Sequence, residues 1–139
     1  MSREIKFRGF LKDIDVIGIG VPHTGHFVIG DLVQGTEYDY IVGGMLEANE
    51  EYSVLEWWQA IQKGTADQFT GLKDINDQDA YEGDIVSLDS DEPPYQIIFA
   101  EGKFEIVGNG INYDLGEEFM DCEIIGNIHE NPELLKANK

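Results

Sequence analysis

The chain has 139 residues, of which 42% are hydrophobic, and 28 acidic residues against 9 basic ones give it a net charge of −19. This length suits one domain or two small ones, and the apolar content is enough for a core, which excludes a disordered chain. The negative charge repels phosphate backbones and anionic membranes, so we expect no direct binding to nucleic acid or to a membrane.

The first part of the chain is predicted to be an antiparallel meander. Polar and apolar residues alternate over residues 4–10, and a β-branched run interrupted by glycines covers residues 16–21. Further strands are expected over residues 26–33 and 38–42, because turn sequences occupy residues 22–25 and 34–37. Alternation at period two bounded by Gly, Pro and Asn is typical of such strands.

One short helix is predicted over residues 53–62. Its apolar residues recur at helical spacing, at Val54, Leu55, Trp58 and Ile61. Ser53 is a suitable N-cap with Glu56 three residues later, and Gly64 is a suitable stop. We place a domain boundary after this helix, which divides the chain into an N-terminal β-rich domain of residues 1–67 and a C-terminal domain of residues 68–139.

The second part is predicted to form a small antiparallel β-barrel. Short strands are expected over residues 84–89, 95–99, 103–107, 112–115 and 123–128, with turns at residues 70–71, 76–77 and 101–102. Closure into a barrel would remove the free edges of so many short strands. Asn131 followed by Pro132 predicts a terminal helical turn, in which Leu134 and Leu135 can pack. The fold class is therefore mainly β, of the α+β type.

Two motifs stand out in the second part of the chain. The stronger one covers residues 68–86, with QFTGLKD at residues 68–74 and YEGDI at residues 81–85, and the other is IGNIHENP at residues 125–132. Both resemble motifs of the YopX family, small proteins of bacteriophages and prophages whose function is unknown, and residues 3–8 and 27–33 are also similar to the family pattern. The resemblance implies an SH3-like C-terminal barrel and assigns no catalytic residue. The chain has Asp77 where the family usually has Gly, and Asp tolerates the left-handed backbone of such a turn.

We identify no catalytic, cofactor-binding or metal site, and we expect no cofactor and no enzymatic activity. Residues 74–79 superficially resemble a calcium loop, but Asp79 stands where Gly is needed and Ile85 where Glu is needed. His23 and His26 are too few for a zinc site, and GIGVPH at residues 18–23 lacks the third glycine of a dinucleotide fingerprint. Cys122 is the single cysteine and is expected to be buried.

The pair Trp57-Trp58 best supports a surface for a protein partner. Both rings of a helical pair are buried only at a wide interface, so we expect one in the core and the other in a partner or oligomer contact with Tyr38 and Tyr40. Burial of both in the core alone stays open. We also expect a homo-oligomer, held by an apolar contact or by the basic residues among residues 3–12.

Three functions remain open from the sequence. The first is a non-enzymatic phage or prophage accessory protein that binds an unidentified protein in the cytoplasm of the bacterial host. The second is an acidic mimic of DNA that inhibits a nucleic-acid-binding protein of the host, and the third is an enzyme with an unrecognised carboxylate site.

Overall fold

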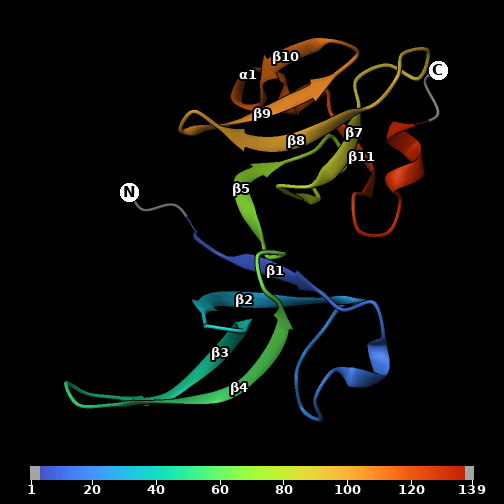
Figure 1. The fold of residues 1–139 in the computed structure, drawn as a ribbon. Coiled ribbons are helices and arrows are strands. Elements are labelled where there is room, and N and C mark those ends of the chain that lie inside the picture. Colours follow the sequence, from blue (N-terminus) through green and yellow to red (C-terminus); the bar gives the residue numbers. More distant parts are fainter. Residues whose placement is uncertain (1–3, 137–139) are drawn as a thin grey trace. The chain divides into compact units, whose positions relative to one another are not determined.

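The computed structural model describes residues 4–136, except the side chains of residues 45–48 and 53, and its contacts divide them into two units, residues 4–68 and residues 69–136. Strands dominate both units, and all of the strand pairs are antiparallel (Figure 1). The mainly β fold class is therefore confirmed. The predicted domain boundary after residue 67 stays a prediction, because contacts within one structure do not test independent folding. Within residues 4–136 no helix is long and apolar enough to cross a membrane.

The first unit is a meander of four strands joined by the beginning of a fifth. The strands are β1 (Phe7–Phe10), β2 (Phe27–Gln34), β3 (Tyr38–Ala48), β4 (Ser53–Gln62) and β5 (Asp67–Lys73), in the sheet order β4-β3-β2-β1-β5. One face of this sheet packs on a core of Leu11, Val21, Val28, Ile41 and Ile61. The predicted meander is thus confirmed for β1, β2 and β3.

The predicted helix over residues 53–62 is wrong, because these residues form strand β4. Their buried side chains, Gln59 and Ile61, are two residues apart, as the period of a strand requires. Trp58, one residue before Gln59, is on the other face and is 61% exposed. Long pairing with β3, from Tyr38↔Gln62 to Ala48↔Ser53, stabilises the extended conformation over the local helical signal.

The predicted strand over residues 16–21 is also wrong. A short 3₁₀ turn, η1 (Ile14–Val16), occupies its beginning, and the Oδ1 atom of Asp13 accepts a hydrogen bond from the backbone N–H of Asp15. Gly20 then has a φ of +83°, which a strand does not allow. Only Val21 of this apolar run is buried in the core.

The second unit contains a five-stranded sheet in the order β10-β9-β8-β7-β11. These strands are β7 (Asp84–Ser87), β8 (Tyr95–Ala100), β9 (Lys103–Gly108), β10 (Ile111–Asp114) and β11 (Glu123–Asn127). They match the five strands predicted for this region. The end of β5 pairs with the short strand β6 (Asp79–Tyr81), a pair that the sequence patterns did not predict.

The core of the second unit includes Val86, Tyr95, Ile97, Ile106 and Leu115. Leu115 begins the short helix α1 (Leu115–Glu118), which continues into η2 (Phe119–Asp121) and connects β10 to β11. A terminal 3₁₀ turn, η3 (Pro132–Leu135), follows Asn131 as predicted. No pairing between described residues closes the sheet, so the predicted barrel is confirmed only as a small antiparallel β unit.

Two tight turns contain a residue with positive φ, and the first of them is the turn predicted at residues 76–77. Asp77 has a φ of +64°, the left-handed conformation expected at the position where the family usually has Gly. Gly83 has a φ of +90°, and the Oδ2 atom of Asp84 accepts a hydrogen bond of 2.8 Å from the backbone N–H of Tyr81. This tight turn leads the chain directly into β7.

Candidate functional site

Three of the four aromatic residues predicted for a contact lie on one face of the β2–β3–β4 sheet. Tyr38 and Tyr40 are two residues apart on β3, and Trp58 of β4 is paired with Val42 in the same alternation. The rings of Tyr40 and Trp58 meet edge to face, with centroids 5.8 Å apart. Because directly paired residues of antiparallel strands share a side, these side chains lie on the side of the sheet opposite the core face, where Tyr38 and Trp58 are exposed and Tyr40 is half-buried.

Strand β2 extends this face with two aliphatic residues. Val33 pairs with Tyr40, and Ile29 lies four residues earlier on the same side of β2. We call the set Ile29, Val33, Tyr38, Tyr40 and Trp58 the aromatic face. Four of its members are substantially exposed: Ile29 at 39%, Val33 at 48%, Tyr38 at 52% and Trp58 at 61%. Neighbouring exposed apolar side chains of this kind mark interaction surfaces more often than single ones do.

The structure separates Trp57 from the aromatic face. Trp57 is directly paired with Gly43 and lies against the core of the first unit. A Cβ atom added at Gly43 would lie 2.4 Å from Cζ2 of the Trp57 ring. The ring therefore covers the space that a side chain at residue 43 would fill, and Trp57 is a packing residue.

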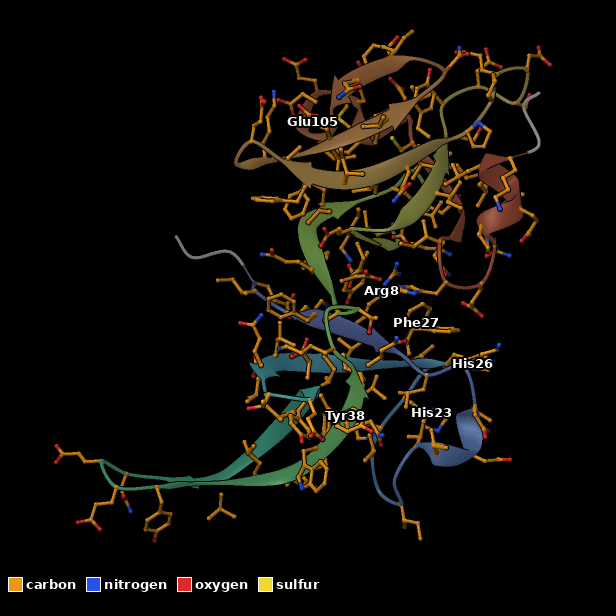
Figure 2. The ribbon with its side chains drawn as sticks, in the orientation of Figure 1. Arg8, His23, His26, Phe27, Tyr38 and Glu105 are labelled. Carbon is orange, nitrogen blue, oxygen red and sulfur yellow. The ribbon has the colours of Figure 1, made fainter. Side chains whose placement is uncertain are left out.

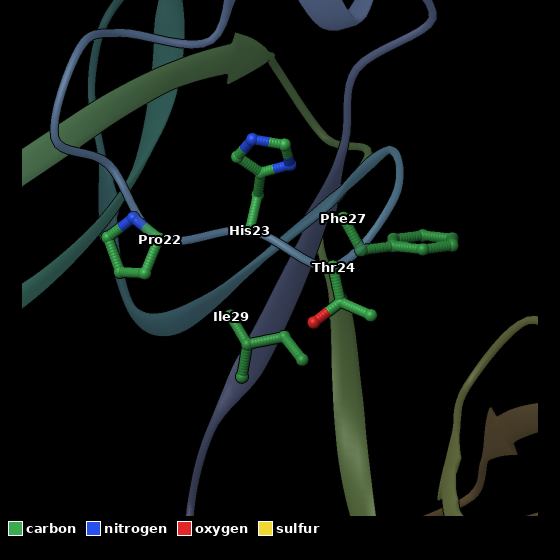
Figure 3. Close-up of a pocket in the computed structure, with 5 residues that line it drawn as sticks. All are labelled: Pro22, His23, Thr24, Phe27 and Ile29. Atoms are coloured by element: carbon green, nitrogen blue, oxygen red, sulfur yellow. The ribbon is translucent and has the colours of Figure 1, made fainter.

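A pocket of about 160 Å³ lies at the β1–β2 end of the same unit (Figure 3). It is lined by Pro22, His23, Thr24, Phe27 and Ile29, so it shares Ile29 with the aromatic face. His23 is exposed on the loop before β2, and its Nδ1 atom donates a hydrogen bond of 2.9 Å to the carbonyl oxygen of Gly25.

Phe27, one wall of the pocket, is held by a buried ion pair. The guanidinium carbon of Arg8 lies 4.5 Å from the centroid of the Phe27 ring, and its Nε atom is 2.9 Å from Oδ2 of Asp67 (Figure 2). Phe10 packs on Phe27 and on His26, at centroid distances of 5.4 and 5.6 Å. This stacking fixes the position of the Phe27 ring in the pocket wall.

Carboxylates lie beside the aromatic face. Asp31 pairs with Val42 and is exposed on the same side as Trp58, and Glu56 lies on that side two residues before Trp58. An apolar centre beside acidic residues is complementary to an apolar surface with basic residues around it. The sequence alone did not identify Ile29 or Val33 as members of this surface, although alternation over residues 27–33 places them on one side.

A second pocket, of about 290 Å³, lies in the second unit. Leu72, Phe99 and Phe104 supply its apolar side, and the rings of Phe99 and Phe104 are 5.0 Å apart. Lys103 is its cation, but Nζ lies 3.5 Å from Asp114 and 3.8 Å from Glu105, so two carboxylates already neutralise it. Glu105 projects from β9 in Figure 2.

The acidic loop that superficially resembles a calcium site is a structural turn. Oδ1 of Asp74 accepts hydrogen bonds from the backbone N–H groups of Asn76 and Gln78, and Oδ2 accepts one from Ile124. Both oxygens of this buried carboxylate are therefore used within the protein. Among the residues that the structure describes, no three or more His, Cys, Asp or Glu side chains are grouped to hold a metal ion.

Cys122 is buried in the core of the second unit, as its apolar surroundings predicted. Burial, together with the smaller effect of the nearby Glu118 carboxylate, raises the pKa of its thiol to about 11. The thiol donates to the backbone carbonyl of Glu118 at 3.4 Å. This arrangement is that of an inert core cysteine, since reactive cysteines have a lowered pKa.

Comparison with known proteins gives a family and a fold. The family model described as YopX protein matches residues 27–136. No curated protein matches the chain. The chain is similar in structure to the protein EF1440 from Enterococcus faecalis, known from a crystal structure, with a TM-score of 0.53 and 22% sequence identity. The match covers 96% of this chain and 99% of that one, and at this identity it shows the fold alone.

Proposed function

The chain belongs to the YopX family, and on this premise we propose that it is a non-enzymatic accessory protein of a phage or prophage. It acts in the cytoplasm of the bacterial host by binding another protein. The observation that supports this proposal is the aromatic face, where Tyr38 and Trp58 are more than half exposed beside Val33 and Ile29. Tyr and Trp are the residues most enriched among the dominant contacts of protein interfaces.

The expected partner has an apolar patch surrounded by basic residues. The apolar part of the contact matches the aromatic face, and the basic part matches Asp31 and Glu56 beside it. Such a charge arrangement accelerates association and selects the partner more than it strengthens binding. Binding should therefore weaken moderately, rather than disappear, when salt screens these charges.

Affinity capture from the host cytoplasm, in infected and uninfected cells, tests the proposal when two matched variants are compared. Tyr38→Ser removes a ring of the aromatic face that is 52% exposed, and Tyr52→Ser removes an equally exposed ring, at 50%, outside that face. We expect Tyr38→Ser to weaken capture about tenfold or more and Tyr52→Ser to leave it unchanged. Capture of no protein above background, or equal loss in both variants, contradicts the proposal.

A second candidate, a mimic of DNA, is favoured by the distribution of charge. Residues 69–139 contain 17 acidic residues against four lysines, and Asp89, Asp91, Glu92 and Glu101 are among the exposed ones. A captured host protein would then bind duplex DNA at the same surface, and duplex DNA would compete with this chain. A captured partner that duplex DNA does not displace removes this candidate.

We also propose that the sheet of the second unit is an incompletely closed SH3-like barrel. The last strand of the unit, β11, pairs with β7, the first strand of the five-stranded sheet. Pairing of the last strand with the first is a feature of small closed barrels. Helix α1 and η2 join β10 to β11, the two strands still unpaired with each other. Slow amide exchange along the outer edges of β10 and β11 is the expected sign of closure in solution, and rapid exchange at both edges contradicts it.

A further inference from the structure

Strand β4 is a long edge strand with little protection against pairing. It begins the sheet order β4-β3-β2-β1-β5, and no strand pairs with its outer side among residues 4–136. Its ten residues include one charged side chain, Glu56, in a chain where 27% of residues are charged. Natural edge strands are usually short, or are protected by lysines, prolines or bulges that oppose further pairing. A long and nearly neutral edge is therefore a site for strand addition.

The hairpin of β3 and β4 also extends beyond its neighbour (Figure 1). Strand β2 pairs with β3 only as far as Asp31↔Val42, whereas β3 and β4 remain paired to Ala48↔Ser53. The outer half of the hairpin is thus a two-stranded ribbon. Such ribbons are marginally stable in water unless a further strand or another surface supports them.

We propose that β4 pairs antiparallel with β4 of a second copy of this chain, about a twofold axis perpendicular to the sheet. The outer backbone groups of both strands then form hydrogen bonds, and the two meanders become one continuous sheet. The contact uses the backbone edge rather than the aromatic face, so it goes beyond the proposed function. Only its consequence rests on the proposed function: the pairing would place the aromatic faces of the two copies side by side on one side of the sheet.

Side-chain alternation restricts the register of this pairing. Residues that are directly opposed across the two strands must lie on the same side of the sheet. The β4 residues that are on the side of the aromatic face can therefore be opposed only to one another. The register that opposes Trp58 to Trp58 pairs Val54 through Gln62 and places Glu56 opposite Ala60. A shift of two residues toward the N-terminus opposes Glu56 to Trp58, and a shift of four opposes the two Glu56 carboxylates, which repel. The Trp58 register therefore joins two large rings without a charge conflict.

The charge of the molecule argues for this contact over the stacking of two aromatic faces. Copies with a net charge of −19 repel one another, and this repulsion is weakest when nearly neutral surfaces meet. Face-to-face stacking brings Asp31 and Glu56 of one copy near those of the other. Edge pairing instead joins the backbones of two β4 strands, each of which has a single carboxylate, Glu56. The twofold symmetry makes this contact self-complementary.

Light scattering on the purified full chain tests the proposal, with two variants that add the same charge to the same side of the sheet. Trp58→Lys opposes two lysines at the twofold axis, whereas Val33→Lys places its lysine on β2, away from the edge. We expect wild type and Val33→Lys to show twice the chain mass of 15.6 kDa, and Trp58→Lys to show the mass of one chain. A wild type that stays monomeric at every protein concentration overturns the proposal, as does a dimer that Trp58→Lys leaves intact or that Val33→Lys dissociates.

Crosslinking gives a second measurement that does not depend on a disruptive variant. In a Cys122→Ala background, mild oxidation of Trp58→Cys should join two chains by a disulfide, and Val33→Cys should stay unlinked. Equal linkage of both variants, or of neither, contradicts the register. The two proposals fail separately: a monomer that still captures a partner through Tyr38 overturns only the edge pairing, and a dimer with Tyr38-independent capture overturns only the proposed function.

Discussion

Replacement of Gly43 by Ala is expected to destabilise the protein because the added methyl group would overlap the indole ring of Trp57. The Cβ atom would lie 2.4 Å from Cζ2 and 2.9 Å from Cε2 of Trp57, and the three nearest atoms all belong to that indole. Gly43 has no left-handed φ, so the backbone accepts Ala without strain. The cost is therefore one of overpacking, and it depends on the size of residue 57.

The magnitude follows from two opposing effects. Overpacking a filled site costs about 1–3 kcal/mol, and Gly→Ala regains about 0.4–1 kcal/mol by restricting the unfolded chain. The net loss of unfolding free energy for Gly43→Ala should be about 1–2 kcal/mol. In a Trp57→Leu background the indole ring is absent, so the same Gly43→Ala change should stabilise by about 0.4–1 kcal/mol. The sign of the effect thus reverses between backgrounds, with a coupling of about 2 kcal/mol.

Urea unfolding of the four proteins, followed by far-ultraviolet circular dichroism, measures this coupling independently of tryptophan fluorescence. The m-values should agree among the four, because the surface exposed on unfolding barely changes. An equal cost of Gly43→Ala in both backgrounds would refute the reasoning. It would also remove the assignment of Trp57 as the residue that covers the glycine.

Three further predictions concern single side chains. Asp77→Gly should raise the free energy of unfolding, measured by urea denaturation, by about 1 kcal/mol, because Asp77 has a φ of +64° that Gly adopts without steric cost. An unchanged or lower free energy of unfolding would show that the Asp77 side chain stabilises the turn. At pH 8 the Cys122 thiol of the folded protein should react with a thiol reagent about a hundredfold more slowly than the same thiol in the unfolded chain, because its pKa is raised from 9.0 to about 11. Equal reaction rates in the two states would contradict the burial of Cys122. Asp39→Asn should reduce the free energy of unfolding at pH 7 and not at pH 2. The hydrogen bond from the backbone N–H of Gly64, and then the Lys63 ammonium group, lowers the pKa of the Asp39 carboxyl in the folded protein. The ionised carboxylate therefore stabilises the fold above the pKa of the unfolded chain, and this stabilisation is lost as the pH falls through the pKa of the folded protein. Thermal unfolding of wild type and variant across this pH range measures the difference, and a pH-independent difference would exclude the ionised carboxylate as its cause.

Strands could be predicted from the sequence wherever one face is buried and the other is not. Residues 95–99 and 103–107 alternate around a turn in which Glu101 and Gly102 both have positive φ, and they form β8 and β9 as expected. Strands β5 and β6 were missed because their register is irregular: Phe69↔Tyr81 is followed by Lys73↔Asp79, with a shift between them. Such an irregularity breaks the period on which strand prediction depends.

The membership of the candidate site was predictable only in part, because it depends on pairing between strands. Tyr38 and Tyr40 are two residues apart, so a strand places them on one side whatever its neighbours are. Trp57 and Trp58 were assigned by helical geometry, about 100° apart, whereas β4 places them on opposite faces. Val33 joins them through its pairing with Tyr40, and no local pattern specifies which strand lies beside which.

The ambiguity of residues 53–62 has a physical origin that bears on function. A strand with one solvated face alternates clearly, but β4 has apolar residues on both sides, with Trp57 and Ile61 toward the core and Val54 and Trp58 away from it. Apolar residues on both sides also fit the period of a helix, which is why the helical pattern emerged. A segment of this kind needs a cover for its second face, and the proposed partner contact provides one.

The distribution of charge is consistent with such a contact in the first unit rather than the second. Residues 4–68 contain 11 acidic and four basic residues, and residues 69–139 contain 17 acidic and four basic ones. The exposed aromatic face and the nearly neutral edge of β4 both belong to the less acidic unit. Repulsion between charged surfaces is weakest there, so binding through apolar side chains or a strand edge meets the least electrostatic opposition. The more acidic unit meanwhile carries most of the net charge, and net charge of one sign opposes aggregation through exposed tryptophan and tyrosine side chains.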